Sequence, residues 1–133
     1  MSETGVAIAQ TANYALGNAT GDIDPALERL MAAAGNLAGL DLLLLMGRDP
    51  ATCDTECGFA MRLHHSIPEV RRALLSLHDS GILGCSSRPA RAHQLCYWLR
   101  QDGPNMSALL RLVETYMSGP RARCGLLRVL AAA

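Results

Sequence analysis

The sequence predicts a mainly helical α+β protein that carries one small β-hairpin. Apolar residues recur at helical spacing through residues 24–47 and 104–130. Between these two stretches, Ser66 and Glu69 have the spacing of a capping box, which is the sharpest sign of a helix start in the chain. Two short β-prone segments follow, residues 82–87 and 94–99, and they flank a basic tip.

The N-terminal third predicts an arm followed by two helices. Residues 1–23 hold few large apolar groups and predict a flexible or weakly helical arm. Asp24-Pro25 starts a helix, because Asp accepts a hydrogen bond from an unpaired N–H and Pro has no N–H to leave unpaired. Gly35-Asn36 breaks that helix, and a second helix follows over about Leu37–Met46. Its run of four leucines predicts a central helix that is covered on more than one side.

The middle of the chain predicts a short helix and then a longer one. Residues 48–50 read as a turn, and Thr52 or Asp54 is expected to cap a short helix through residues 59–63, which His64-His65 closes. The longer helix starts at the capping box and ends before Gly81, which can supply a left-handed turn. Its inward stripe is expected to be Val70, Leu74 and Leu77.

The two β-prone segments predict an antiparallel hairpin. If Arg88 pairs with His93 across a four-residue loop, Cys85 falls directly opposite Cys96. A slip of one residue would remove that alignment.

The C-terminal residues predict two more helices. One is amphipathic, and Pro120 divides it from the second. The expected apolar face of the first helix consists of Met106, Leu109, Leu110, Val113 and Met117; the second helix carries Cys124, Leu126, Leu127, Val129 and Leu130.

Composition excludes several classes of protein. The longest apolar run, Leu40 to Met46, is far shorter than the roughly 20 residues that cross a bilayer. The N-terminus lacks the basic flank of a signal peptide, and five cysteines are an odd number, so we expect a cytoplasmic protein with free thiols. No enzyme motif is found, and we expect neither an enzyme nor a cofactor.

The zero net charge conceals a gradient. Residues 1–47 hold one Arg against five acids, residues 48–103 hold seven Arg against six acids, and residues 104–133 hold four Arg against one Glu. Binding to nucleic acid would therefore have to be local to one face.

The order of the expected elements and the pattern of residues along them resemble the winged helix-turn-helix domains of bacterial transcriptional regulators. The residues that carry the resemblance are Phe59-Ala60-Met61-Arg62-Leu63, Ser66, Val70, Leu74, Leu77, Gly81, Ile82 and Leu83. The resemblance covers about residues 37–100. It implies a recognition helix at about 66–80 and a wing at about 82–99. It divides the chain into the arm, a winged-helix domain over 24–103 with a leading helix, and C-terminal helices over 104–133 that form a homodimer.

The resemblance implies a regulator that binds double-stranded DNA. An Arg fork can grip a phosphate or the edge of a guanine, and a basic hairpin tip suits the DNA backbone. The candidate DNA-contacting residues are Ser66, Pro68, Glu69, Arg71, Arg72 and Ser76 on the helix, and Arg88, Arg91 and His93 on the wing.

Two alternatives stay open at this point. The same fold can serve as a protein-interaction module, which the zero net charge and the acidic Glu69 favour. The chain could also be a metal- or thiol-responsive regulator, with Cys53, Cys57, Cys85 and Cys96 as the candidate ligands. The ordinary role of such thiols is to fill the core as small apolar groups, and no metal is assigned.

Overall fold

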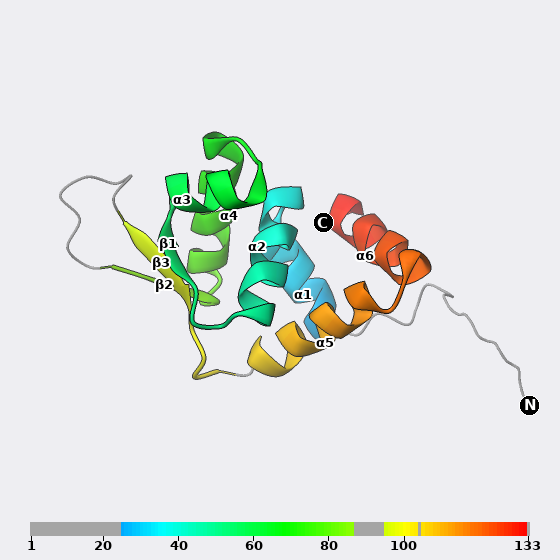
Figure 1. The fold of residues 1–133 in the computed structure, drawn as a ribbon. Coiled ribbons are helices and arrows are strands. Elements are labelled where there is room, and N and C mark those ends of the chain that lie inside the picture. Colours follow the sequence, from blue (N-terminus) through cyan, green and yellow to red (C-terminus); the bar gives the residue numbers. More distant parts are fainter. Residues whose placement is uncertain (1–24, 87–94, 104, 133) are drawn as a thin grey trace, which may run out of the picture.

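The computed structural model describes residues 25–86, 95–103 and 105–132, so the predicted arm over residues 1–23 lies outside the described residues. The described chain forms a helical body with a three-stranded antiparallel sheet at one side (Figure 1). The elements are α1 (Pro25–Ala34), α2 (Leu37–Arg48), β1 (Cys53–Thr55), α3 (Glu56–Leu63), α4 (Ile67–Asp79), β2 (Leu83–Cys85), β3 (Cys96–Leu99), α5 (Asn105–Met117) and α6 (Pro120–Ala132). The predicted mainly helical α+β class is confirmed.

The junction between α1 and α2 lies where the sequence predicts a break. Gly35 has a φ of 75°, a left-handed conformation that glycine adopts without strain, and the two helices are bent by 118°. Asn36 caps α2, because its Oδ1 accepts a hydrogen bond of 2.8 Å from the N–H of Gly39. A Cβ at Gly39 would lie 2.1 Å from the carbonyl oxygen of Ala34, so the tight junction requires glycine there.

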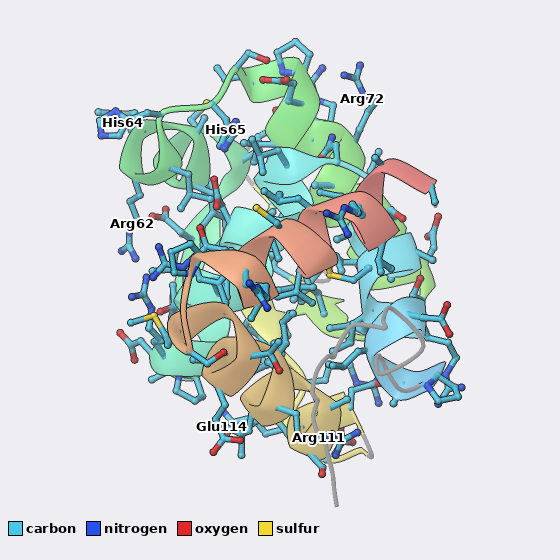
Figure 2. The ribbon with its side chains drawn as sticks, turned by 90° about the vertical axis from the view of Figure 1, so that its right-hand side faces the viewer. Arg62, His64, His65, Arg72, Arg111 and Glu114 are labelled. Atoms are coloured by element: carbon cyan, nitrogen blue, oxygen red, sulfur yellow. The ribbon has the colours of Figure 1, made fainter. Side chains whose placement is uncertain are left out.

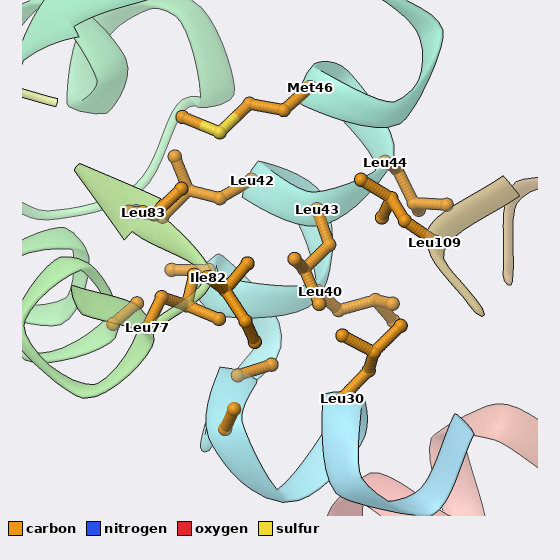
Figure 3. Close-up of a cluster of buried hydrophobic side chains, with 14 of the residues drawn as sticks. Leu30, Leu40, Leu42, Leu43, Leu44, Met46, Leu77, Ile82, Leu83 and Leu109 are labelled. Atoms are coloured by element: carbon orange, nitrogen blue, oxygen red, sulfur yellow. The ribbon is translucent and has the colours of Figure 1, made fainter. Parts of the chain in front are cut away.

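Helix α2 runs through the centre of the core, as its leucine run predicts. Leu42, Leu43 and Met46 are fully buried. Figure 3 shows Leu42 beside Leu83 on one side of the helix and Leu44 beside Leu109 on another, within one buried cluster. A helix covered on several sides can carry an apolar sequence all round without exposing it to water.

The chain between α2 and α3 differs from the prediction. Residues Cys53–Thr55 form strand β1, which the sequence analysis missed. Thr55, and not Thr52 or Asp54, caps α3, since the Thr55 hydroxyl accepts a hydrogen bond of 3.1 Å from the N–H of Gly58. Thr52 instead donates its hydroxyl proton to the carbonyl of Asp49, and a carboxylate oxygen of Asp54 accepts from the N–H of Thr55. The Thr52 side chain is thus used in the turn before β1, and the Asp54 carboxylate is used within β1 itself.

Helix α4 agrees closely with the prediction. The capping box is present: the N–H of Glu69 donates to the Ser66 hydroxyl at 3.4 Å, and the N–H of Ser66 donates to a Glu69 carboxylate oxygen at 3.3 Å. The predicted inward stripe is fully buried, together with the neighbouring Ala73. Gly81 has a φ of 80°, which confirms the left-handed turn after the helix.

The sheet has the order β1-β3-β2, so β3 lies between the other two strands. On the β2 side Cys85 pairs with Tyr97, and Leu83 pairs with Leu99. The expected alignment of Cys85 with Cys96 is wrong, because the observed register is shifted by one residue. A shift of one residue moves a side chain to the other face of the sheet. Cys96 instead pairs with Thr55 of β1.

Helices α5 and α6 cover the side of the core away from the sheet (Figure 1). Pro120 begins α6, as predicted. The predicted apolar face of α5 is partly wrong: Ala108, Leu109 and Leu112 are buried, whereas Leu110 and Met117 are exposed. On α6, Leu126 and Leu130 are buried and Leu127 is exposed. No single helix among the described residues has the length and apolar composition needed to cross a membrane; only the bent pair α1 and α2, taken together, reaches both.

Candidate functional site

The candidate site is the outer side of α4 together with the end of α3 that precedes it. Figure 2 shows His64 and Arg72 toward the end of the molecule opposite Arg111 and Glu114 of α5, with Arg62 at the side between them. The inner side of α4 is buried against α2 and β2. Among the described residues, the outer side is therefore the part of this helix that is left uncovered.

Two of the candidate residues serve the helix cap. The Ser66 hydroxyl donates to a Glu69 carboxylate oxygen at 3.0 Å and accepts from the Glu69 N–H. The side-chain and backbone hydrogen bonds of Ser66 lower the pKa of Glu69, since they favour its ionised form. The negative charge of Glu69 is thus stabilised by the cap, which also fixes where the helix begins.

The start of α4 is also tied to α2. His65 Nε2 lies 2.7 Å from Asp41 Oδ2, and His65 Nδ1 lies 3.8 Å from Glu69 Oε1. The Asn36 side-chain amide donates to the carbonyl of Glu69 at 3.2 Å. His65 is 15% exposed, so this link is largely sheltered from water. These contacts hold the first turn of α4 in one position relative to the core.

Arg71 reaches back to the protein. Its Nη2 donates to Glu56 Oε1 at 2.7 Å, and its Nε donates to Glu56 Oε2 at 3.2 Å, which is a bidentate pair. The Glu56 side chain is 5% exposed and that of Arg71 is 52% exposed. Hydrogen bonding to Glu56 raises the pKa of Arg71. Sequence reasoning placed Arg71 correctly toward solvent but missed this partner.

Arg72 is placed differently from Arg71. It is exposed, and it makes no ion pair with any residue that the structure describes. Figure 2 shows its side chain pointing away from the ribbon. Pro68 is also exposed, and Ser76 is half-buried. On a helix, Pro68, Arg72 and Leu75 lie near one line, because they are four and three residues apart.

Sequence reasoning missed two further polar residues of this surface. Arg62, at the end of α3, lies 3.2 Å from Asp54 and its side chain is half exposed. His64 is exposed and has a φ of 58°, a left-handed conformation that ends α3. The pair His64-His65 after the helix was the available signal, although only the fold shows that His65 turns inward and His64 outward.

Large apolar side chains are exposed on the same two helices. Met61 of α3 is 78% exposed, and Ile67 and Leu75 of α4 are 39% and 48% exposed. Asp79 adds an acid at the end of α4. This surface therefore combines exposed apolar, basic and acidic side chains, and its positive charge is weak.

Comparison of the chain with protein-family models, curated proteins and solved structures found no match.

The predicted wing residues Arg88, Arg91 and His93 lie outside the described residues. The described strands on either side of them, β2 and β3, pair as the two arms of a hairpin. The segment over 87–94 therefore joins two neighbouring antiparallel strands, as the sequence predicts.

The four candidate cysteine ligands do not gather at one point. Cys85 packs partly buried against the core, in agreement with the ordinary role of such thiols. Cys53 and Cys57 are exposed, so for them the core-filling role is wrong. Among the residues that the structure describes, no group of three or more His, Cys, Asp or Glu side chains could hold a metal ion.

Proposed function

We propose that this chain is a winged-helix transcriptional regulator that binds double-stranded DNA. The observation that carries the proposal is the succession α3, α4 and the β2–β3 hairpin, with β1 pairing beside β3 to complete the sheet. In this arrangement α4 is the recognition helix, and the connection between β2 and β3 is the wing.

The position of α4 supports this use. A recognition helix must present one side to the major groove while the other side is held by the domain. In α4 the inner stripe is fully buried and the outer line of Pro68 and Arg72 is open. His65 is linked to Asp41 of α2, and Asn36 at the start of α2 is linked to the backbone of Glu69. Together these contacts fix the position of the first turn of α4. A fixed helix loses less freedom on binding than a mobile one.

The cations suited to phosphate are few and local. Arg72 on α4 and Arg88 and Arg91 on the wing are the residues that we propose to hold the DNA backbone. Arg71 already donates hydrogen bonds to the Glu56 carboxylate, so we propose that it positions α4 and contributes less to DNA binding. Three phosphate contacts per protomer predict a slope of log affinity against log salt of about −3, or about −5 for a dimer.

A homodimer suits the exposed apolar residues of the terminal helices. Leu110 and Met117 are seven residues apart on α5 and share one side of that helix. Leu127 of α6 is 41% exposed. These residues offer a surface for a second copy of the chain. Sedimentation of the wild-type chain and of a Leu110→Ser variant tests this, with a dimer expected for the wild type and a shift toward monomer for the variant.

The decisive experiment measures binding to mixed-sequence duplex DNA at several salt concentrations. Arg72→Ala and the double variant Arg88→Ala/Arg91→Ala should each weaken binding and flatten the slope, by about one unit and two units for each protomer. Arg121→Ala, an exposed arginine of α6, is the matched control and should leave the slope unchanged. Equal slopes for all variants, or no binding at low salt, would contradict the proposal.

A protein partner is the second candidate function. Met61, Ile67 and Leu75 expose apolar surface on the helices that would face DNA, and the acids of α4 oppose phosphate. In that case Leu75→Ser should abolish the interaction and Arg72→Ala should have little effect. If the partner is DNA, Arg72→Ala should weaken binding more than Leu75→Ser does. The same two variants therefore distinguish a protein partner from DNA.

A further inference from the structure

The outer face of the sheet carries two thiols on neighbouring strands. Cys53 pairs with Trp98, and Thr55 pairs with Cys96, across β1 and β3. Opposite residues share a face, and so do residues two apart on one strand. Cys53, Cys96 and Trp98 therefore lie on the same face, whereas Tyr97, between the last two, is buried on the other. Both cysteines are free; Cys53 is exposed and Cys96 is half-buried.

The indole of Trp98 leaves space beside these thiols. A Cβ at Gly84 would lie 2.5 Å from Trp98 Nε1, so the ring lies over Gly84 of β2. Cys53 is on β1, at the opposite side of β3. The absence of a side chain at Gly84 thus lets the ring lean away from the strand that carries Cys53.

The two thiols are close enough to affect each other. Partial burial, followed by the neighbouring Cys96 thiol, raises the pKa of Cys53. Yet the two residues are diagonal neighbours in the ladder and not direct partners. Diagonal Cα atoms are roughly 7–8 Å apart, and the usual Cα separation across a disulfide is shorter, about 5.5–6 Å. A direct S–S bond would therefore require the strands to shift.

A metal ion held between the two sulfurs bridges a wider gap. With the zinc–sulfur bond of about 2.3 Å as a guide, an ion held in line by two thiolates spans roughly 4.6 Å between the sulfurs, whereas the S–S bond of a disulfide is only about 2.0 Å. Structural zinc sites need four ligands, and the described residues offer no third metal-binding side chain here. Soft thiolates select soft ions, of which monovalent copper is the physiological example.

We propose that Cys53 and Cys96 form a two-thiolate site for one soft ion, with Cu(I) as the ion of choice and Hg(II) as its chemical analogue. On binding, each thiol loses its proton and each sulfur donates an electron pair to the ion. No electron is transferred, so the ion enters as Cu(I) and leaves as Cu(I). Because two protons are released, the affinity rises with pH. The site does not depend on DNA binding and can be tested without it.

The single tryptophan of the chain provides the readout. Trp98 is 38% exposed and is the direct cross-strand partner of Cys53. Titration of the reduced full-length chain with Cu(I), without oxygen and with excess glutathione as competitor, should load one ion per chain. Trp98 fluorescence should fall in proportion to loading, since a heavy soft ion close to an indole quenches its emission.

Three variants test the assignment. Cys53→Ser and Cys96→Ser should each lose both the retained ion and the quenching. Cys124→Ser removes an exposed thiol of α6 and is the matched control, which should load like the wild type. Circular dichroism of each variant checks that the fold is kept, and Hg(II) titration provides a second measurement should one variant lose it.

Specific results would overturn the site. Retention of the ion by both Cys53→Ser and Cys96→Ser, or loss of it in Cys124→Ser, would place the ion elsewhere. Failure of the wild type to hold Cu(I) or Hg(II) against glutathione would exclude a chelate. A Cys53–Cys96 disulfide in the oxidised protein, found by peptide mapping together with no retained ion, would instead make the pair a redox couple.

Discussion

Replacement of Gly39 by alanine tests how tightly the α1–α2 junction is packed. The new Cβ would lie 2.1 Å from the carbonyl oxygen of Ala34 and 2.8 Å from its Cα, closer than the 3.0 Å below which real Cβ atoms essentially never approach another atom. Both contacts are to backbone, so no side-chain rotation can relieve them. Helices α1 and α2 must therefore separate by about 0.9 Å at this point.

The expected cost follows from two opposing effects. Overpacking a well-filled site costs about 1–3 kcal/mol, and a backbone clash belongs at the upper end of that range. Alanine also gains up to about 1 kcal/mol over glycine as a helix former. We expect Gly39→Ala to lower the free energy of unfolding by about 2 kcal/mol, which for a chain of this size lowers Tm by roughly 6–10 °C.

The assay is urea and thermal unfolding followed by circular dichroism and Trp98 emission. Gly125→Ala is the matched control, because Gly125 is also in a helix but a Cβ there meets nothing within 4 Å. The control should be as stable as the wild type or more so, by about 0.5–1 kcal/mol. If Gly39→Ala were as stable as Gly125→Ala, the proposed close contact between α1 and α2 would be wrong.

Two further predictions concern α4. Arg71→Ala should lower stability at neutral pH, since it leaves the buried Glu56 carboxylate without its bidentate partner, and adding Glu56→Gln should recover part of the loss in urea unfolding. No recovery in the double variant would mean that Arg71 acts through packing. Ser66→Ala should cost about 1 kcal/mol at pH 7 through loss of the cap. Because the folded protein lowers the pKa of Glu69, its carboxylate stabilises the fold above the ordinary pKa of 4.5, and this stabilisation is lost as the pH falls through the lowered pKa. The difference in unfolding free energy between Ser66→Ala and wild type should therefore narrow below about pH 4.5. An unchanged gap in acid would remove Glu69 from the cap.

The elements predicted correctly from the sequence are those defined by local chemistry. The capping box at Ser66 and the left-handed glycine at Gly81 are decided within four or five residues, and both are present. The break before α2 is likewise a matter of Gly35 and Asn36 alone. Such signals depend on neighbouring backbone groups and can be recognised without knowledge of the fold.

The features that were missed depend on residues far apart in the chain. Strand β1 has only three residues, and its partner β3 lies about 40 residues further on, so no local pattern announces it. The register of β2 and β3 is decided by buried partners such as Leu83 and Leu99, and a loop length guessed from sequence gave a slip of one residue. The pair of Arg71 with Glu56 joins two helices, and spacing along one helix could not reveal it.

The arginines of α3 and α4 differ in what they can offer a polyanion. Arg62 and Arg71 each lie against an acid at the junction of β1 and α3, Asp54 and Glu56 respectively. Their charges are thus partly neutralised before any partner arrives. Arg72 has no ion pair among the residues that the structure describes, although its charge helps to lower the pKa of Glu69 one turn away. Helix α4 alone therefore offers one cation without a direct acidic partner. One such contact supports only weak binding.

The proposed affinity for DNA must therefore come mainly from outside α4. Arg88 and Arg91 on the connection between β2 and β3 would supply two phosphate contacts to the one from Arg72, and a second protomer would double all three. It follows that the double wing variant should flatten the salt dependence about twice as much as Arg72→Ala. The reverse order would mean that α4 holds the backbone through groups other than Arg72, with Arg71 released from Glu56 as the first candidate. If Arg71 leaves Glu56 to contact DNA, Glu56→Gln should strengthen DNA binding, because the competing carboxylate charge is gone. If Arg71 does not contact DNA, Glu56→Gln should change DNA binding little.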